Sequence, residues 1–139
     1  MGREAIKAAL ADSIGAALPD ARLEGFGGAP AKPGAIGADG LVELEGISDG
    51  EQSVDLNPFT YHKTARFDLV VAARTADAAG AMLAAIGAAI EADRTLGGAS
   101  EWADADGGDF DDQTQAGSAG HCEVRITVSA EYTTTNPLD

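Results

Sequence analysis

Apolar residues recur every four positions near the start of the chain, which is the spacing of one face of an α-helix. The stripe consists of Ile6, Leu10, Ile14 and Leu18. It predicts an amphipathic helix over residues 3–18. Pro19 ends the pattern because proline cannot continue the hydrogen bonds of a helix.

Four later segments have the composition and alternation of β-strands: residues 22–26, 41–47, 60–74 and 122–134. The last is the clearest, because Val124, Ile126 and Val128 alternate with polar neighbours along its length. Each convincing strand is apolar on one face only. This predicts a sheet with one face in the core and the other in water.

A second helix is expected to follow Thr75 or Asp77 and to stop at Gly97 or Gly98. One side carries the larger apolar residues, whereas the other is smooth where a solvated face would carry several charges. The smooth side consists of Gly80, Ala84, Gly87 and Ala88, with Glu91 as its main charge. Glycine inside a helix costs roughly 1 kcal/mol against alanine, which favours packing by a neighbouring subunit over a mere Ala-rich composition.

Two connecting segments are long and polar. Residues 48–58 exceed a tight hairpin turn and predict a protruding loop, and residues 99–120 predict an acidic, Gly-rich loop. Protruding loops often carry contacts. The contact residues expected in them are Asp49, Gly50, Glu51, Gln52, Trp102 and Phe110. For the two aromatic residues, folding back onto the core of the same subunit is the alternative.

The order helix, strand, strand, strand, helix, strand predicts a single α+β domain over residues 1–139. We expect two layers, with helices packed on one face of a mixed, mostly antiparallel four-stranded sheet. The other face of the sheet would be exposed to solvent. Its acidic residues are Glu43, Glu45, Asp68, Glu123 and Glu131, with Arg66 and Arg125 among them.

The charge of the chain narrows the classes of partner. The chain has 23 acidic and 9 basic residues, which gives a net charge of −14. This charge argues against nucleic-acid binding, because phosphates are bound by clustered Lys and Arg. The single cysteine, Cys122, fits a reducing cytoplasm and is expected to be a small buried hydrophobic residue. No apolar run approaches membrane-spanning length. We therefore expect no contact with a membrane.

No motif in the sequence points to catalysis. The aspartates of residues 104–112 depart from the calcium-loop order, and a nucleophile elbow, a Walker motif and a dinucleotide fingerprint are all missing. His121 and Cys122 are neighbours that would point to opposite faces of a strand. We expect no enzyme activity, no cofactor and no metal.

The C-terminal half resembles the tail terminator, or tail completion, proteins of long-tailed phages and prophages. The resemblance lies in the strand of residues 61–72, in residues 88–98, which end in Asp93-Arg94-Thr95-Leu96-Gly97-Gly98, and in the closing Glu131-Tyr132-Thr133-Thr134. An N-terminal helix, the loop Phe26-Gly27-Gly28 and a final Asn136-Pro137-Leu138-Asp139 also fit, so that the resemblance covers most of the chain. The acidic loop around residues 103–112 is richer in Asp than that family implies.

The resemblance implies a homo-hexameric ring that closes the head-proximal end of the tail tube and offers a docking surface to the neck. The smooth helix side would form the subunit seam, and the acidic sheet face would line a bore through which DNA passes unbound. Partners would be the tail tube protein and a neck or head-completion protein. The protein would be assembled in the bacterial cytoplasm and reside in the virion tail.

Other interpretations of the sequence stay open. A tail tube or neck subunit would share a two-layer domain, although a tube subunit would polymerise instead of stopping at one ring. A small acidic enzyme or ligand-binding domain, acting as a monomer, is the alternative from a different class, and it predicts a deep pocket with convergent polar groups.

Overall fold

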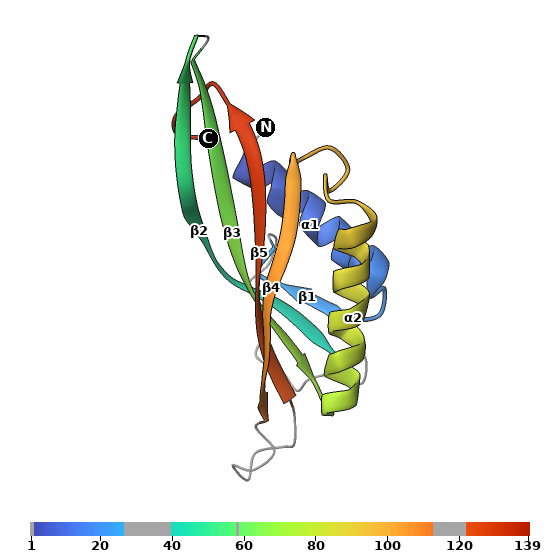
Figure 1. Ribbon diagram of the computed structural model, residues 1–139. Helices are drawn as coiled ribbons and strands as arrows, with labels where there is room; N and C mark the ends of the chain where they lie inside the picture. The colour runs from blue at the N-terminus through green and yellow to red at the C-terminus, as the bar shows by residue number, and fades with distance from the viewer. Residues whose placement is uncertain (1, 27–39, 58, 113–121) are drawn as a thin grey trace.

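The computed structural model describes residues 2–26, 40–57, 59–112 and 122–139, apart from the side chains of residues 108–112. The described residues form two helices and five strands, whose arrangement Figure 1 shows. They are α1 (Arg3–Ala17), β1 (Arg22–Glu24), β2 (Leu41–Leu56), β3 (Phe59–Ala73), α2 (Ala76–Ala92), β4 (Trp102–Asp112) and β5 (Cys122–Thr134). The fold is α+β.

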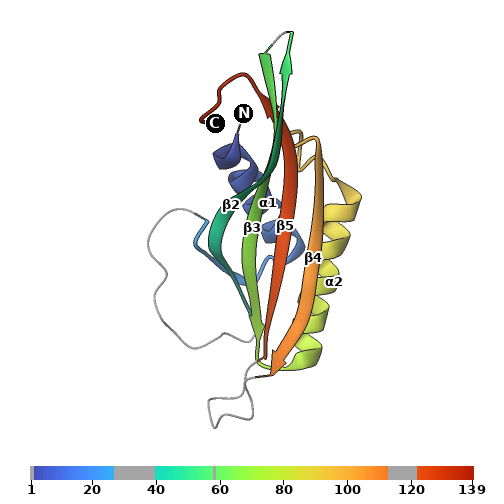
Figure 2. The ribbon, with the colours of Figure 1, turned by 60° about the vertical axis from the view of Figure 1, so that its left-hand side comes forward.

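The five strands form one mixed sheet in the order β1-β2-β3-β5-β4. Only β1 and β2 run parallel, whereas the pairs β2–β3, β3–β5 and β4–β5 are antiparallel. Both helices lie on the same face of the sheet, as the two views in Figures 1 and 2 show. The expected one-sided, two-layer arrangement is therefore present in the described residues, with one strand more than predicted.

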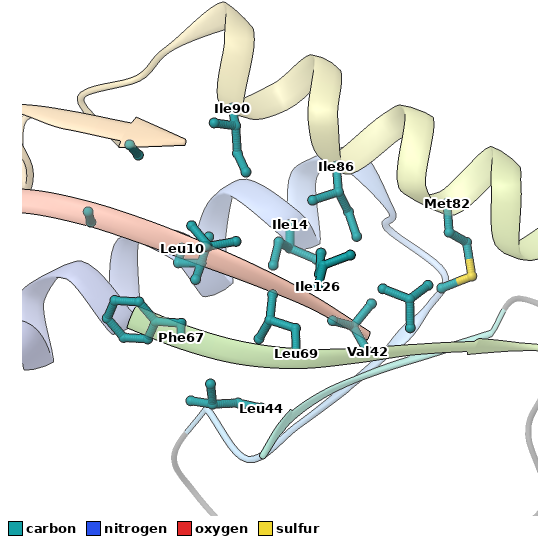
Figure 3. Close-up of a cluster of buried hydrophobic side chains, with 14 of the residues drawn as sticks. Leu10, Ile14, Val42, Leu44, Phe67, Leu69, Met82, Ile86, Ile90 and Ile126 are labelled. Atoms are coloured by element: carbon teal, nitrogen blue, oxygen red, sulfur yellow. The ribbon is translucent and has the colours of Figure 1, made fainter. Parts of the chain in front are cut away.

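The core lies between this sheet face and the helices (Figure 3). Leu10 and Ile14 of α1 and Ile86 of α2 pack toward Phe67 and Leu69 of β3, and each of these five side chains is almost fully buried. Fully burying such a side chain contributes about 1.5–3 kcal/mol. The four-residue stripe of the first helix therefore faces the core as predicted, up to Ile14.

The prediction that residues 99–120 form a loop was wrong for their first half. Residues 102–112 form β4, which pairs with β5 and makes the sheet five-stranded. Ala103 is buried opposite Ala130, whereas Trp102 and Asp104 are exposed. Alanine and glycine give little hydrophobic contrast, so the alternation is faint in the sequence, and pairing with β5 supplies the hydrogen bonds that make the strand.

The prediction of a loop over residues 48–58 was also wrong. β2 continues to Leu56 and pairs with β3 as far as Phe59, so the connection is a tight hairpin. Two irregularities interrupt the register, one between Leu44 and Gly46 and one between Asp49 and Gln52. A bulge shifts the inward and outward positions, which is why a strict alternation stops at residue 47.

The second helix begins as predicted and ends earlier than predicted. Thr75 is its N-cap, and the Thr75 side chain accepts a hydrogen bond from the Ala78 N–H at 3.1 Å. The helix stops at Ala92, where Asp93 is the C-cap, and not at the two glycines that follow. Those glycines belong to a separate turn, in which Gly97 and Gly98 have φ angles of +72° and +95°.

Candidate functional site

The sheet face opposite the helices, here called the outer face, carries the acidic residues singled out in the sequence. The alternation of β2, β3 and β5 places all five on it: Glu43, Glu45, Asp68, Glu123 and Glu131. β4 adds two more aspartates, since Asp104 lies opposite Ser129 and Asp106 opposite Thr127. The structure thus brings these carboxylates onto one surface, and their role there stays a prediction.

Two acidic residues of the outer face interact with side chains of a different strand. Arg125 of β5 forms an ion pair with Glu45 of β2, across the intervening β3. The Thr127 hydroxyl donates a hydrogen bond to Asp68 at 3.1 Å. Arg66 also lies on this face. β1 adds Glu24 and Arg22 to this face, and the Arg94 guanidinium reaches it by pairing with Asp104. Among the described side chains, eight carboxylates against four arginines leave the outer face net negative.

The outer face is not uniformly polar. Val70 and Ala72 of β3 are buried on it, 6% and 2% exposed, and their register neighbours are Glu43 and Leu41 of β2. On this face the C-terminal end of β3, which leads to α2, is therefore apolar, whereas Arg66 and Asp68 nearer the middle of β3 are charged and exposed.

The β2–β3 hairpin extends past the ends of both helices (Figure 1). Residues 49–57 and 59–64, here called the hairpin arm, include no buried residue. The arm is amphipathic because alternate residues point to opposite faces. Its helix-side face is polar near the base, at Asp49, Gln52 and Lys63, and apolar near the tip, where it carries Val54, Leu56, Phe59 and Tyr61. Its outer face is polar.

The apolar residues near the arm's tip are strongly exposed. Leu56 is 73% exposed, Phe59 59% and Val54 40%. Leu56 and Phe59 are directly opposite each other, as are Val54 and Tyr61, so the four side chains form one patch. Sequence reasoning missed this patch because it treated residues 48–58 as a loop. The signal was the alternation of Val54 with Leu56 and of Phe59 with Tyr61.

The expected contact residues Asp49, Gly50, Glu51 and Gln52 lie at the base of the arm and not at its tip. The Arg3 guanidinium of α1 donates a hydrogen bond to Asp49 at 3.2 Å. On β3, the Lys63 ammonium donates to the carbonyls of Pro137 and Asp139, at 2.5 and 3.1 Å. The base is thus tied to α1 and to the chain after β5, which holds the arm in one direction.

The smooth side of α2 faces away from the core. Ala84, Gly87, Ala88 and Glu91 are exposed and Gly80 is half-buried, and a Cβ added at Gly80 or Gly87 would meet no atom within 4 Å. Beside Gly87 lies an apolar groove of about 160 Å³ between α2 and the edge of the sheet. The groove is lined by Leu83, Ile86, Gly87, Ala105, Asp106, Gly107 and Ile126.

The two aromatic residues expected in a loop both lie in β4. Trp102 is 50% exposed and does not fold onto the core; the Arg94 guanidinium stacks on its ring, 4.6 Å from the centroid. Arg94 also donates hydrogen bonds to the Ala103 carbonyl and the Asp104 carboxylate, both at 3.1 Å. Phe110 lies opposite Val124, and its side chain lies outside the described residues.

One group on the arm could exchange protons near neutral pH. His62 Nε2 lies 2.7 Å from the Asp55 carboxylate, and this hydrogen bond raises the pKa of His62 above its usual 6.5. Ser53 lies opposite His62, beside a polar hollow of about 240 Å³. Among the contacts between described residues, no hydrogen bond joins Ser53 to His62, and a nucleophile needs its base within that reach. This cluster therefore lacks the geometry of a catalytic triad.

A second hollow, of about 530 Å³, lies between α1 and the turn after α2. Its polar side chains include Asp12, Ser13 and Asp93, but the Asp93 carboxylate is taken up by its own turn. In the described part of the chain, no three His, Cys, Asp or Glu side chains come together as metal ligands.

The chain matches no protein-family model and no curated protein. Within residues 2–26, 40–57, 59–112 and 122–139, no helix combines the length and the apolar character needed to cross a membrane. Three surfaces of the described residues are candidates for contact with other molecules: the outer face, the hairpin arm, and the smooth side of α2 with its groove.

Proposed function

We propose that the protein is a structural subunit of a long phage tail, which assembles into a hexameric ring and closes the head-proximal end of the tail tube. The observation that carries the proposal is the outer face: among the described residues neither helix covers it, and its eight carboxylates outnumber four arginines. Turned inward in a ring, this face would line a bore whose negative charge keeps passing DNA from adhering.

Two further features support a role in assembly over one in catalysis. The chain presents an exposed apolar arm and a smooth helix side, and contiguous exposed apolar surface marks interaction sites. Two of the segments that resemble tail terminators are ordered parts of this fold. Residues 93–98 form the turn from α2 to β4, and residues 131–134 pair with β3. The proposed partners are further copies, the tail tube protein and a neck protein, with DNA passing unbound.

The test is the mass of the purified protein in solution, measured by light scattering and followed by electron microscopy. We expect a discrete ring of about six subunits, because a heterologous interface that closes on itself stops growing. Purified tube subunits would then be added, and the ring should cap one end of the tubes and halt their elongation. Matched samples without tube subunits give the baseline mass.

The other outcomes separate the competing functions. Open tubes formed by the protein alone would show a tube subunit, and binding to a head connector without tube capping would show a neck subunit. The proposal would be contradicted if the protein stayed a monomer, formed no ring by itself and did not bind to added tube subunits. The His62–Asp55 hollow would then be the first place to test for a small ligand.

A further inference from the structure

The apolar face of the hairpin arm is an uncovered extension of the core side of the sheet. The side chains that continue this face along β3 toward the helices, Ala65 and Phe67, are buried under them. Next on this face is Lys63, opposite Gln52 and bonded to the Pro137 and Asp139 carbonyls; beyond it, toward the tip, follow Tyr61 and Phe59, opposite Val54 and Leu56. Large apolar side chains in such a pattern are ordinarily covered.

We propose that this face of the arm docks into the groove between α2 and β4 of a second copy of the chain. This inference rests on the proposed ring, for which it supplies the joint between neighbouring subunits. The arm contributes Leu56 and Phe59, and the accessible surface of the groove comes from the half-buried Leu83 and the exposed Gly87, Ala105 and Gly107.

The two surfaces fit each other in shape and polarity. The groove is lined mainly by aliphatic carbons, and two of its lining residues, Gly87 and Gly107, carry no side chain. A sheet face can therefore approach α2 closely, as the core face of the same sheet approaches the inner side of α2 within one subunit. The outermost helix side is nearly free of charge, so that burying it leaves few unpaired ions.

The positions of the two surfaces suit a chain of subunits. The arm begins from β2 and β3, and the groove lies at β4, the opposite edge of the sheet order. One copy can therefore give its arm to one neighbour and its groove to another at the same time. Such a head-to-tail joint closes into a ring when its rotation allows, whereas an arm-to-arm contact would stop at two copies.

The arm is held ready for docking. At its base, Arg3 contacts Asp49, and Lys63 contacts the carbonyls of Pro137 and Asp139. A contact element that is ordered before binding loses less conformational entropy when it docks. The tip is thus presented on a braced support, although its own apolar side chains lie in solvent.

Cysteine cross-linking tests the joint directly. The Phe59→Cys and Gly87→Cys changes are introduced together, and the native Cys122 stays because it is buried. A Cβ at Gly87 meets no neighbouring atom, so that Gly87→Cys fits the monomer. Under mild oxidation we expect a ladder of disulfide-linked oligomers that collapses with reductant. The matched control combines Gly87→Cys with Ser53→Cys on the polar face of the same arm, and it should give no ladder.

A second variant measures the strength of the joint. Leu56→Ser combined with Phe59→Ser removes the exposed tip residues without touching the core, so the thermal midpoint of the isolated subunit should not change. We expect self-association to weaken by about 10- to 100-fold per lost side chain, from the value of burying such a residue. The same measurement on Ser53→Ala should match the unchanged protein.

The outcomes separate this joint from the proposed function. A ring with no Phe59–Gly87 ladder would overturn the joint and leave the terminator proposal standing. A ladder from a protein that forms no ring, alone or on tubes, would support the joint and contradict the terminator proposal. Equal cross-linking of both cysteine pairs, or cross-linking of the arm only to an added tube subunit, would also overturn the joint.

Discussion

At the scale of single residues, Asp93 organises the turn between α2 and β4. One carboxylate oxygen accepts from the Thr95 N–H at 3.0 Å and the Thr95 hydroxyl at 2.5 Å, and the other accepts from the Gly97 N–H at 2.9 Å. Between these contacts Leu96 adopts φ +50°, a left-handed conformation that costs about 1–2 kcal/mol for a non-glycine residue. Burial of the Leu96 side chain offsets that cost.

We predict that Asp93→Asn lowers the thermal midpoint of the subunit. The turn uses both oxygens of Asp93 as acceptors, whereas an amide has one oxygen and would turn its NH₂ group toward an N–H donor. The measurement is thermal unfolding followed by circular dichroism at pH 7. Asp20→Asn, at an exposed position after Pro19, is the control and should leave the midpoint unchanged.

The same residue predicts a dependence on pH. The hydrogen bond from the Thr95 hydroxyl, with those from the Gly97 and Thr95 backbone, lowers the pKa of Asp93 below its ordinary 3.8. A lowered pKa in the folded state gives stability that is present above the unfolded value and lost as pH falls through the folded value. Between pH 5 and pH 2 the unchanged protein should therefore lose more stability than Asp93→Asn. Parallel losses would contradict this assignment.

At the scale of elements, the sequence predicts a segment well where local pattern and tertiary contacts agree. α1, β3 and β5 have clear periodicity, and the structure places them within a few residues of the expected ranges. β4 and the distal half of β2 were missed for two separate reasons. Apart from Trp102 and Phe110, β4 consists of Ala, Gly and Asp, which have low strand propensity. β2 contains bulges that break its alternation.

For α2 we predict that Gly80→Ala stabilises the isolated subunit by about 0.5–1 kcal/mol, because glycine in a helix loses more backbone entropy on folding. Its added methyl group meets no atom within 4 Å. Urea unfolding of dilute protein is the measurement.

Gly107→Ala is the opposite control for Gly80→Ala. Gly107 has φ +102°, and its Cβ would come 2.8 Å from the Arg125 carbonyl oxygen, so this change should destabilise the fold. A loss of stability in Gly80→Ala would show that the exposed side of α2 is already covered within the subunit.

At the scale of the whole molecule, a net charge of −14 on 139 residues makes copies of this chain repel one another. An apolar arm and groove must overcome that repulsion when subunits associate. We therefore predict that association strengthens as salt rises, since the Debye length falls from about 30 Å at 0.01 M to about 10 Å at 0.1 M.

Light scattering across a series of sodium chloride concentrations measures this effect. The control is the Leu56→Ser, Phe59→Ser variant, which keeps the net charge and should stay dissociated over the series. Association that weakens with added salt would show that opposite charges hold the subunits together, and this would contradict an apolar joint.

The sequence by itself determined the class of the fold, the core face of α1 and the side of the sheet on which the acidic residues lie. These properties follow from the helical period of 3.6 residues and the strand period of 2 residues within single segments. Such local patterns do not depend on the rest of the chain. The tertiary structure decided that residues 102–112 are a strand, because the hydrogen-bonding partner, β5, lies elsewhere in the chain. It also decided which apolar residues remain outside. Leu56 and Phe59 alternate like core residues, and only the lengths of the helices beside them leave the hairpin arm uncovered.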